Sequence, residues 1–191
     1  MVMVALLAAV HIATAQKISD YTLHISKTGQ EAANLHVACS FEVDFQGTDS
    51  ISMYFGGGLE FSIDKLKMHG DGYEYTYDYT QKKIVIRRKD DQTVRVGMDY
   101  DYTNLSAFFI YGEGDAELWE PSFGEYFYPY VPNTCMDVAI EVETPDLLSF
   151  LCSYPLAANS ATRSSGTLRH FLSQSLTLAF LRTDAYQRTE A

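Results

Sequence analysis

Residues 117–155 read ELWEPSFGEYFYPYVPNTCMDVAIEVETPDLLSFLCSYP and give the first indication of the fold. The first part of this stretch joins the single tryptophan, Trp119, to a cluster of tyrosines and phenylalanines, and three prolines interrupt residues 121–132. Each proline removes a backbone donor and fixes φ, so we expect neither a helix nor a central strand there. Met136–Thr144 then alternates mainly apolar with acidic residues, which predicts a strand. We expect the rigid aromatic part to present its side chains at the surface of a β domain.

Alternating segments of the same kind recur from residue 18 to residue 111, separated by turns that contain glycine and other polar residues. The alternation predicts a strand in each of them: 18–26, 33–45, 50–55, 59–68, 73–79, 84–86, 93–98, 99–103 and 105–111. No helical period competes before residue 157. Regularly spaced short strands are typical of antiparallel sandwiches, so we expect an all-β domain, an antiparallel β-sandwich or a saddle-like sheet.

The N-terminus has the pattern of a secretory signal peptide. Residues 1–12 are apolar but too short to span a bilayer, and Ala13-Thr14-Ala15 offers small residues where signal peptidase reads them. We therefore expect a signal peptide over residues 1–15 and a secreted or periplasmic protein; the alternative is a buried N-terminal element. There is no lipobox cysteine, so no stable membrane anchor is indicated. The net charge of -11 argues against nucleic acid as a partner.

The composition changes after Pro155. Residues 156–191 use arginine and no lysine, and serine and threonine dominate. Their apolar residues fit one helical face loosely: Leu168, Phe171, Leu172, Leu176, Ala179 and Phe180. Two interpretations are open, a short amphipathic helix that closes the domain or a segment outside the native reading frame. We therefore expect a β domain over residues 16–155 and a tail over residues 156–191 that carries no site.

The sequence offers no motif for catalysis or metal binding. None of the five histidines lies in an H-E-x-x-H motif. His24 and His36 are single histidines on predicted strands, and we expect them to be structural or solvated. We therefore predict no catalytic residue, no metal ligand and no cofactor in this chain. Cys39, Cys135 and Cys152 allow at most one disulfide, and we favour three buried, reduced thiols.

Tyrosines at positions 73, 75, 77 and 79 are expected on one face of a strand. Such a row can form a platform for carbohydrate or peptide, because tyrosine has a flat apolar body and a polar tip. Cross-strand packing is the more common role, and it is the interpretation that we favour.

The order of these segments resembles the N-terminal β domain of the aminopeptidase N family of zinc metallopeptidases, the gluzincins. Tyr21–Ile25 (YTLHI) is similar to the opening strand of that domain, and Asp49–Met53 (DSISM) to its strand of aspartate-x-isoleucine-x-leucine. Tyr128-Pro129 is similar to the Phe-Pro step, and Glu141–Pro145 (EVETP) to the strand that ends in proline. The resemblance covers residues 18–155 and implies a saddle-like β domain that precedes a thermolysin-like catalytic domain.

The resemblance also implies a substrate contact. In the family, a glutamate or glutamine nine residues before the proline of the Phe-Pro step helps to bind the free α-amine of the substrate, and Glu120 stands nine residues before Pro129. A carboxylate suits this role because an ammonium group needs a charge-assisted acceptor. We expect Glu120, with its neighbour Trp119, to contact substrate in a full-length form, and we expect zinc only in a catalytic domain outside this sequence.

The expected function is that of a non-catalytic N-terminal domain of a secreted zinc-aminopeptidase-like protein, which caps the substrate cleft of a full-length form. Its partners would be the catalytic domain and the peptide substrate. Zinc hydrolases need three protein ligands and an open position, and none is apparent here, so we expect no hydrolysis by this chain alone. The alternative is a stand-alone extracellular β-sandwich that binds glycan or peptide through Trp119 and nearby tyrosines.

Overall fold

A computed structural model describes the chain over residues 17–27, 29, 34–55, 61–104, 108–111, 118–123, 127–132, 134–146, 148–172 and 176–182. For β8 and β9, introduced below, this description covers the backbone only. The predicted signal peptide lies outside the described residues. Among the residues in these ranges, no helix has the length and apolar character needed to cross a membrane.

The described residues form strands and no helix, which confirms the all-β class. The strands are β1 (Lys17–Lys27), β2 (Asn34–Asp44), β3 (Ser50–Tyr54), β4 (Phe61–His69), β5 (Tyr73–Asp78), β6 (Lys83–Arg88), β7 (Thr93–Asn104), β8 (Phe108–Tyr111), β9 (Leu118–Phe123), β10 (Cys135–Glu143), β11 (Leu148–Cys152), β12 (Ala157–Ala158), β13 (Arg163–Leu172) and β14 (Leu178–Arg182). Along β2, buried and half-buried residues alternate without a break. This period is the one expected of a strand that packs one face on a core.

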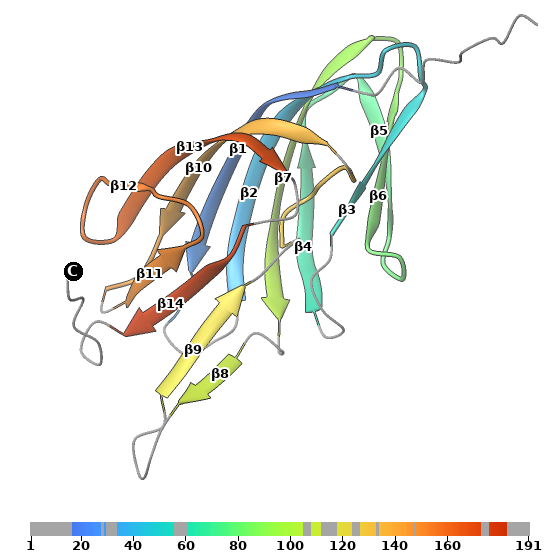
Figure 1. The fold of residues 1–191 in the computed structure, drawn as a ribbon. Coiled ribbons are helices and arrows are strands. Elements are labelled where there is room, and N and C mark those ends of the chain that lie inside the picture. Colours follow the sequence, from blue (N-terminus) through green and yellow to red (C-terminus); the bar gives the residue numbers. More distant parts are fainter. Residues whose placement is uncertain are drawn as a thin grey trace, which may run out of the picture.

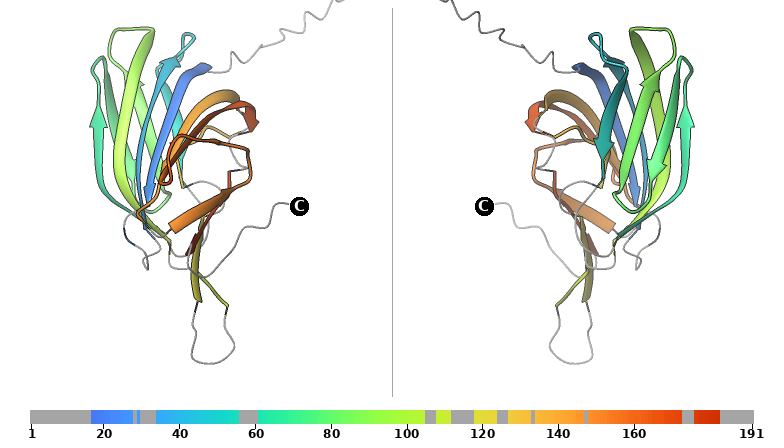
Figure 2. Two further views of the ribbon diagram at one scale, coloured as in Figure 1. Left: turned by 90° about the vertical axis from the view of Figure 1, so that its left-hand side faces the viewer. Right: turned by 90° about the vertical axis from the view of Figure 1, so that its right-hand side faces the viewer.

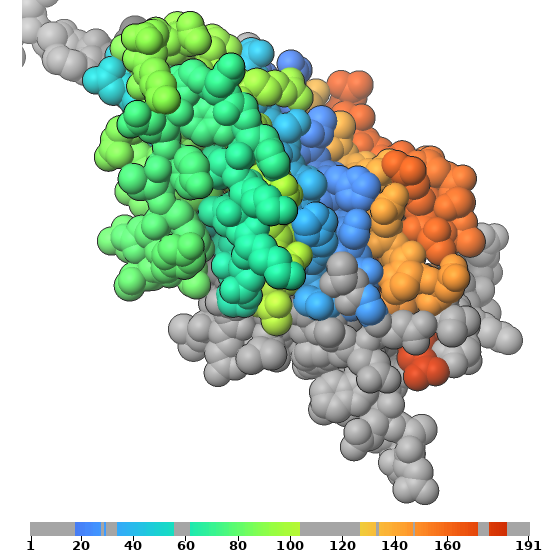
Figure 3. Space-filling view, turned by 180° about the vertical axis from the view of Figure 1, so that it is seen from behind, coloured from blue at the N-terminus to red at the C-terminus, as the bar shows by residue number. Residues whose placement is uncertain are grey.

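The strands form three sheets (Figure 1). The seven-stranded sheet has the order β12-β13-β10-β1-β2-β7-β4, the four-stranded sheet β11-β14-β9-β8, and the three-stranded sheet β3-β6-β5. Viewed from behind, β4, β7, β2, β1 and β10 follow one another in this order across one face of the molecule (Figure 3). Buried residues of all three sheets belong to one hydrophobic core, so the two smaller sheets complete a sandwich-like body.

The large sheet is mixed. β1 and β10 run parallel, with Tyr21 opposite Val138, whereas the other pairs in this sheet are antiparallel. The sheets are mostly antiparallel, as expected, and this parallel pair is an exception within the large sheet. The reason is that β1 and β10 are far apart in the sequence, and a long connection permits the crossover that parallel pairing needs.

The tail forms strands where it is described, so the predicted C-terminal helix is wrong. β13 pairs with β10, and β14 pairs with β11 and β9. A register shift beside β13 puts Leu168 opposite Val138 and Phe171 opposite Met136, and both Leu168 and Phe171 are buried. Two buried residues three positions apart imitate a helical period, and here an irregular strand produces it. The large sheet therefore contains residues from both sides of Pro155.

The aromatic segment packs into the core. Phe127 and Tyr128 are 0% and 2% exposed, and their rings meet edge to face at 5.1 Å. The hydroxyl of Tyr100 donates to the Phe127 carbonyl at 2.9 Å. The hydroxyl of Tyr21 donates to the Pro129 carbonyl at 2.7 Å. The expectation that this segment presents its aromatic side chains at the surface is wrong here, because two buried hydroxyls satisfy its carbonyls and make burial of an irregular backbone possible.

β9 includes Pro121, although the prolines of residues 121–132 led us to expect no strand in the interior of a sheet there. It pairs with β8 as far as Pro121 and with β14 at Ser122 and Phe123. The proline thus stands where β9 exchanges one partner strand for the other. The expectation is wrong because a missing N–H at such a junction interrupts neither ladder.

Candidate functional site: a histidine between two glutamates

His24, Glu141 and Glu143 meet on the polar face of the large sheet, and we call these three residues the β1–β10 cluster. His24 lies on β1, and both glutamates lie on β10, where the intervening Val142 is fully buried. The parallel register sets His24 opposite Glu141 and Ser26 opposite Glu143. Because side chains alternate between the faces of a strand, both carboxylates project to the side on which the imidazole lies.

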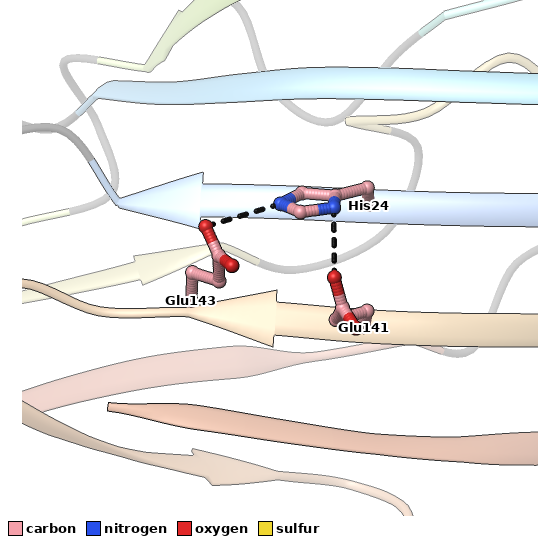
Figure 4. Close-up of side chains that lie close together, drawn as sticks. All are labelled: His24, Glu141 and Glu143. Carbon is pink, nitrogen blue, oxygen red and sulfur yellow. Dashed lines mark ion pairs between the residues drawn. The ribbon is translucent and has the colours of Figure 1, made fainter. Parts of the chain in front are cut away.

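The imidazole bridges the two carboxylates (Figure 4). Its Nδ1 lies 3.0 Å from Oε1 of Glu141, and its Nε2 lies 3.4 Å from Oε2 of Glu143. Nε2 also lies 3.1 Å from Oγ of Ser26. The side chains of His24, Glu141 and Glu143 are 37%, 25% and 40% exposed. The cluster is thus partly shielded by the sheet, yet small solutes can reach it.

Arg163 on β13 contacts both glutamates. Its Nη2 donates to Oε1 of Glu141 at 2.5 Å, and its Nε lies 3.5 Å from Oε1 of Glu143. The hydrogen bond from Arg163 lowers the pKa of the Glu141 carboxyl, and the nearby charges of Arg163 and His24 act in the same direction. Two carboxylates therefore share one guanidinium, and one formal negative charge is left in excess when His24 is neutral.

A pocket of about 440 Å³ lies against the β1–β10 cluster. His24 and Glu141 form part of its wall, together with the hydroxyl-bearing side chains of Thr22, Ser165 and Thr167. Hydroxyl groups both donate and accept hydrogen bonds. The pocket can therefore hold water molecules next to the imidazole and the Glu141 carboxylate.

Two further histidine–carboxylate pairs lie on the same sheet. His36 Nδ1 is 3.0 Å from Oδ1 of Asp101, and His69 Nε2 is 2.5 Å from Oδ2 of Asp99. Lys65 Nζ lies 2.8 Å from the second oxygen of Asp101, and the pKa of that carboxyl is lowered, first by Lys65 and then by His36. Each of these two pairs combines one carboxylate with one histidine, whereas the β1–β10 cluster combines two carboxylates with one histidine.

The residues that the family resemblance singled out lie on β9. Trp119 pairs with Ile110 and Glu120 with Phe109 through the backbone of β8. Their side chains lie outside the described residues, so their proposed substrate contact stays a prediction. β9 belongs to the four-stranded sheet, and the β1–β10 cluster belongs to the seven-stranded sheet, so the two regions share no sheet.

The cysteines are free thiols in three different environments. Cys39 is buried, Cys152 is half-buried and Cys135 is exposed. The expectation of burial is therefore confirmed for Cys39 and wrong for Cys135. Position explains the difference, because Cys39 lies in the middle of β2, whereas Cys135 is the first residue of β10, on the face opposite its buried neighbour Met136.

The four tyrosines at positions 73–79 do not form one flat platform. Tyr73 is 8% exposed, and Tyr77 packs edge to face on Phe55 with ring centroids 6.1 Å apart. Tyr75 and Tyr79 are 45% and 67% exposed. Packing is thus confirmed as the role of Tyr73 and Tyr77, and the exposed rings that remain belong to two residues.

No protein-family model matches the sequence. A search of curated proteins finds no significant relative either. The link to the aminopeptidase N family therefore depends on the order of the sequence motifs and on an all-β body, and it stays a hypothesis.

Sequence reasoning missed the β1–β10 cluster. The available signal was the pair Glu141 and Glu143 on one face of a strand, together with the polar-face position of His24 on another strand. The relation between the two strands was not available from the sequence. It comes from the parallel pairing of β1 with β10, a contact between distant parts of the chain.

Proposed function

We propose that this chain is a non-catalytic N-terminal β domain of a secreted or periplasmic zinc-aminopeptidase-like protein, and that it covers the substrate cleft of a full-length form. Its partners are then a catalytic domain that carries the zinc and the peptide substrate held between the two domains. Within this role, Glu120 binds the free α-amine of the peptide, and Trp119 forms part of the adjoining wall.

One observation carries the proposal. β8 and β9 form a two-stranded projection that extends beyond the large sheet, and β9 contains Trp119 and Glu120 (Figures 1 and 2). A projecting strand pair can enter a cleft in a neighbouring domain, whereas a strand inside the large sheet cannot. The residues that the resemblance selects therefore lie where an interdomain contact is sterically possible.

The fold supports the same role. The seven-stranded sheet is twisted and curved, and the smaller sheets pack with it around one core (Figure 2). A twisted sheet is compatible with the saddle-like sheet that the resemblance implies for a domain that precedes a catalytic domain. The aromatic segment then serves the stability of the domain, since Phe127 and Tyr128 are buried.

The first test is an activity measurement on the purified chain. Amino-acid anilides are offered as substrates with and without added zinc. We expect no release of the aniline above that of a zinc-only blank, because the proposal places the catalytic zinc in a separate domain. Zinc-dependent turnover that follows the chain through purification would contradict the proposal.

The second test uses the full-length form. Glu120→Gln removes the charge that meets the ammonium group, and the matched control Glu74→Gln changes a glutamate whose side chain is 75% exposed on β5. Hydrogen bonds to charged groups contribute about 1.5–3 kcal/mol, so kcat/KM should fall by roughly 10- to 150-fold for substrates with a free α-amine. N-acetylated substrates should show no such loss. Equal kinetics of the two variants would exclude the assigned role of Glu120.

A further inference from the structure

We propose that the β1–β10 cluster binds a divalent cation of the zinc class, with His24, Glu141 and Glu143 as ligands and with Arg163 as a competitor for the two carboxylates. This inference does not rest on the proposed function, since it concerns the outer face of the large sheet and not the β8–β9 projection.

The donor set suits such a cation. Imidazole nitrogen favours zinc, copper and nickel, and carboxylate oxygen completes many zinc sites. One ligand atom from each of His24, Glu141 and Glu143 lies within 4.8 Å of the other two. Ligands at about 2.1 Å from zinc lie at most about 4.2 Å from one another, so the three ligand atoms must move closer together, and the cation takes one ring nitrogen of His24 in place of the carboxylate that now faces it.

The fold holds these ligands in place. His24 and Glu141 are directly opposite in the parallel register, and Glu143 is two residues further along the same strand. β10 lies between β1 and β13 in the interior of the large sheet, so the backbones of both ligand-bearing strands are fixed by pairing on both sides. Ligands that are fixed before binding cost less conformational entropy when the ion arrives.

The pocket provides the remaining coordination positions. A zinc ion with three protein ligands keeps a position for water. Thr22, Ser165 and Thr167 line the pocket beside His24, and their hydroxyls can hydrogen-bond to a water on the metal. A cation at this point would therefore face an open volume of about 440 Å³ and not the core.

Arg163 competes with the cation for the carboxylates of Glu141 and Glu143. Its guanidinium lies within hydrogen-bond distance of Glu141 and within 3.5 Å of Glu143, so metal and arginine compete for the lone pairs of these carboxylate oxygens. Arg163 is itself exposed and can turn to solvent when the cation binds. The cation then replaces the arginine as the positive partner of two carboxylates, and Arg163 lowers the apparent metal affinity.

The test is titration of the purified chain with zinc chloride in a non-chelating buffer, followed by calorimetry. Because three thiols and other histidines also bind zinc, the ring nitrogens of His24 are monitored by ¹H–¹⁵N correlation spectra. We expect the His24 signals to change with the first equivalent and before those of His36. His24→Gln and Glu143→Gln should each lower the affinity at least about tenfold, since even residues that only support a metal ligand change affinity by about 10- to 100-fold.

Arg163→Gln should raise the affinity about 30-fold, the factor for the repulsion between a divalent cation and one unit charge at about 4 Å in water. His36→Gln is the matched control and should leave the affinity unchanged, because it removes a histidine from a pair with one carboxylate. Melting curves in metal-free buffer show whether each variant is folded. Unchanged His24 signals, equal affinities of the His24→Gln and His36→Gln variants, or weaker binding by Arg163→Gln would overturn the proposal.

Discussion

Removing one buried hydroxyl that holds the aromatic segment should destabilise the whole domain. Tyr21→Phe deletes the donor to the Pro129 carbonyl, and Tyr100→Phe deletes the donor to the Phe127 carbonyl. Both tyrosines are buried, with 2% and 0% exposure, so water cannot replace the lost donor. A buried acceptor left without a partner costs about 1–3 kcal/mol. Each variant should therefore lose about that amount of unfolding free energy.

The assay is thermal or urea unfolding followed by circular dichroism. In a chain of this size, 1 kcal/mol corresponds to about 2–4 °C in Tm, so each variant should melt about 2–12 °C lower. Tyr75→Phe is the matched control, because Tyr75 is 45% exposed, and its effect should stay within about 0.5 kcal/mol. If Tyr21→Phe and Tyr100→Phe were as stable as this control, the two hydrogen bonds would not be what fixes the segment.

Two further predictions concern pH and backbone conformation. Burial raises the pKa of the Cys39 thiol to about 12 from an ordinary value near 9. The stability that the buried, neutral thiol contributes is therefore complete below about pH 9 and is lost as the pH rises towards 12. Between about pH 9 and 12, the free energy of unfolding of the wild type should therefore fall faster than that of Cys39→Ala, by up to about 1.4 kcal/mol per pH unit. Urea titrations at several pH values measure both free energies, and an equal dependence on pH for the two proteins would contradict this prediction. Gly70→Ala should cost more than about 2 kcal/mol, because Gly70 has φ +109° and its Cβ would lie 2.4 Å from a carbonyl oxygen of β7. Gly47→Ala, at φ +83° with no heavy atom within 4 Å of the new Cβ, should cost only the strain of about 1–2 kcal/mol; equal losses in the two variants would refute the clash.

The local patterns of the sequence predict the strands well. β2 and β10 alternate in burial as their apolar and polar residues alternate in sequence. The residues 93–98 and 99–103, expected as two strands, form the single strand β7, in which Val94, Val96, Met98, Tyr100 and Tyr102 are buried. The strand continues because its period of two is never broken, and Asp99 and Asp101 simply occupy the polar face.

The failures come from contacts between distant residues. Leu168 and Phe171 are apolar and three positions apart, a spacing that suggested a helix. In the structure both are buried on one strand, because a register shift opposite β10 brings both into the core. The aromatic segment was expected at the surface, since its prolines exclude regular pairing, but Tyr21 and Tyr100 reach it from strands β1 and β7. Neither effect can be read from a local window of sequence.

In the candidate site, too, some positions follow from the local sequence pattern and others follow only from strand pairing. The positions of Glu141 and Glu143 on one face follow from the E-V-E pattern alone. That His24 lies between them follows only from the parallel pairing of β1 with β10. Arg163 joins them from a segment in which no site was expected, because β13 pairs with β10 and places Arg163 opposite Glu143.

We propose that this β domain works together with a zinc-bearing catalytic domain, and the DNA downstream of codon 191, read in all three frames, can decide this. We expect an open reading frame there that encodes an H-E-x-x-H motif on a helical pattern and a further glutamate ligand, the donor set of a thermolysin-like zinc site. Downstream DNA that encodes no such motif in any frame would refute the proposed role of the domain.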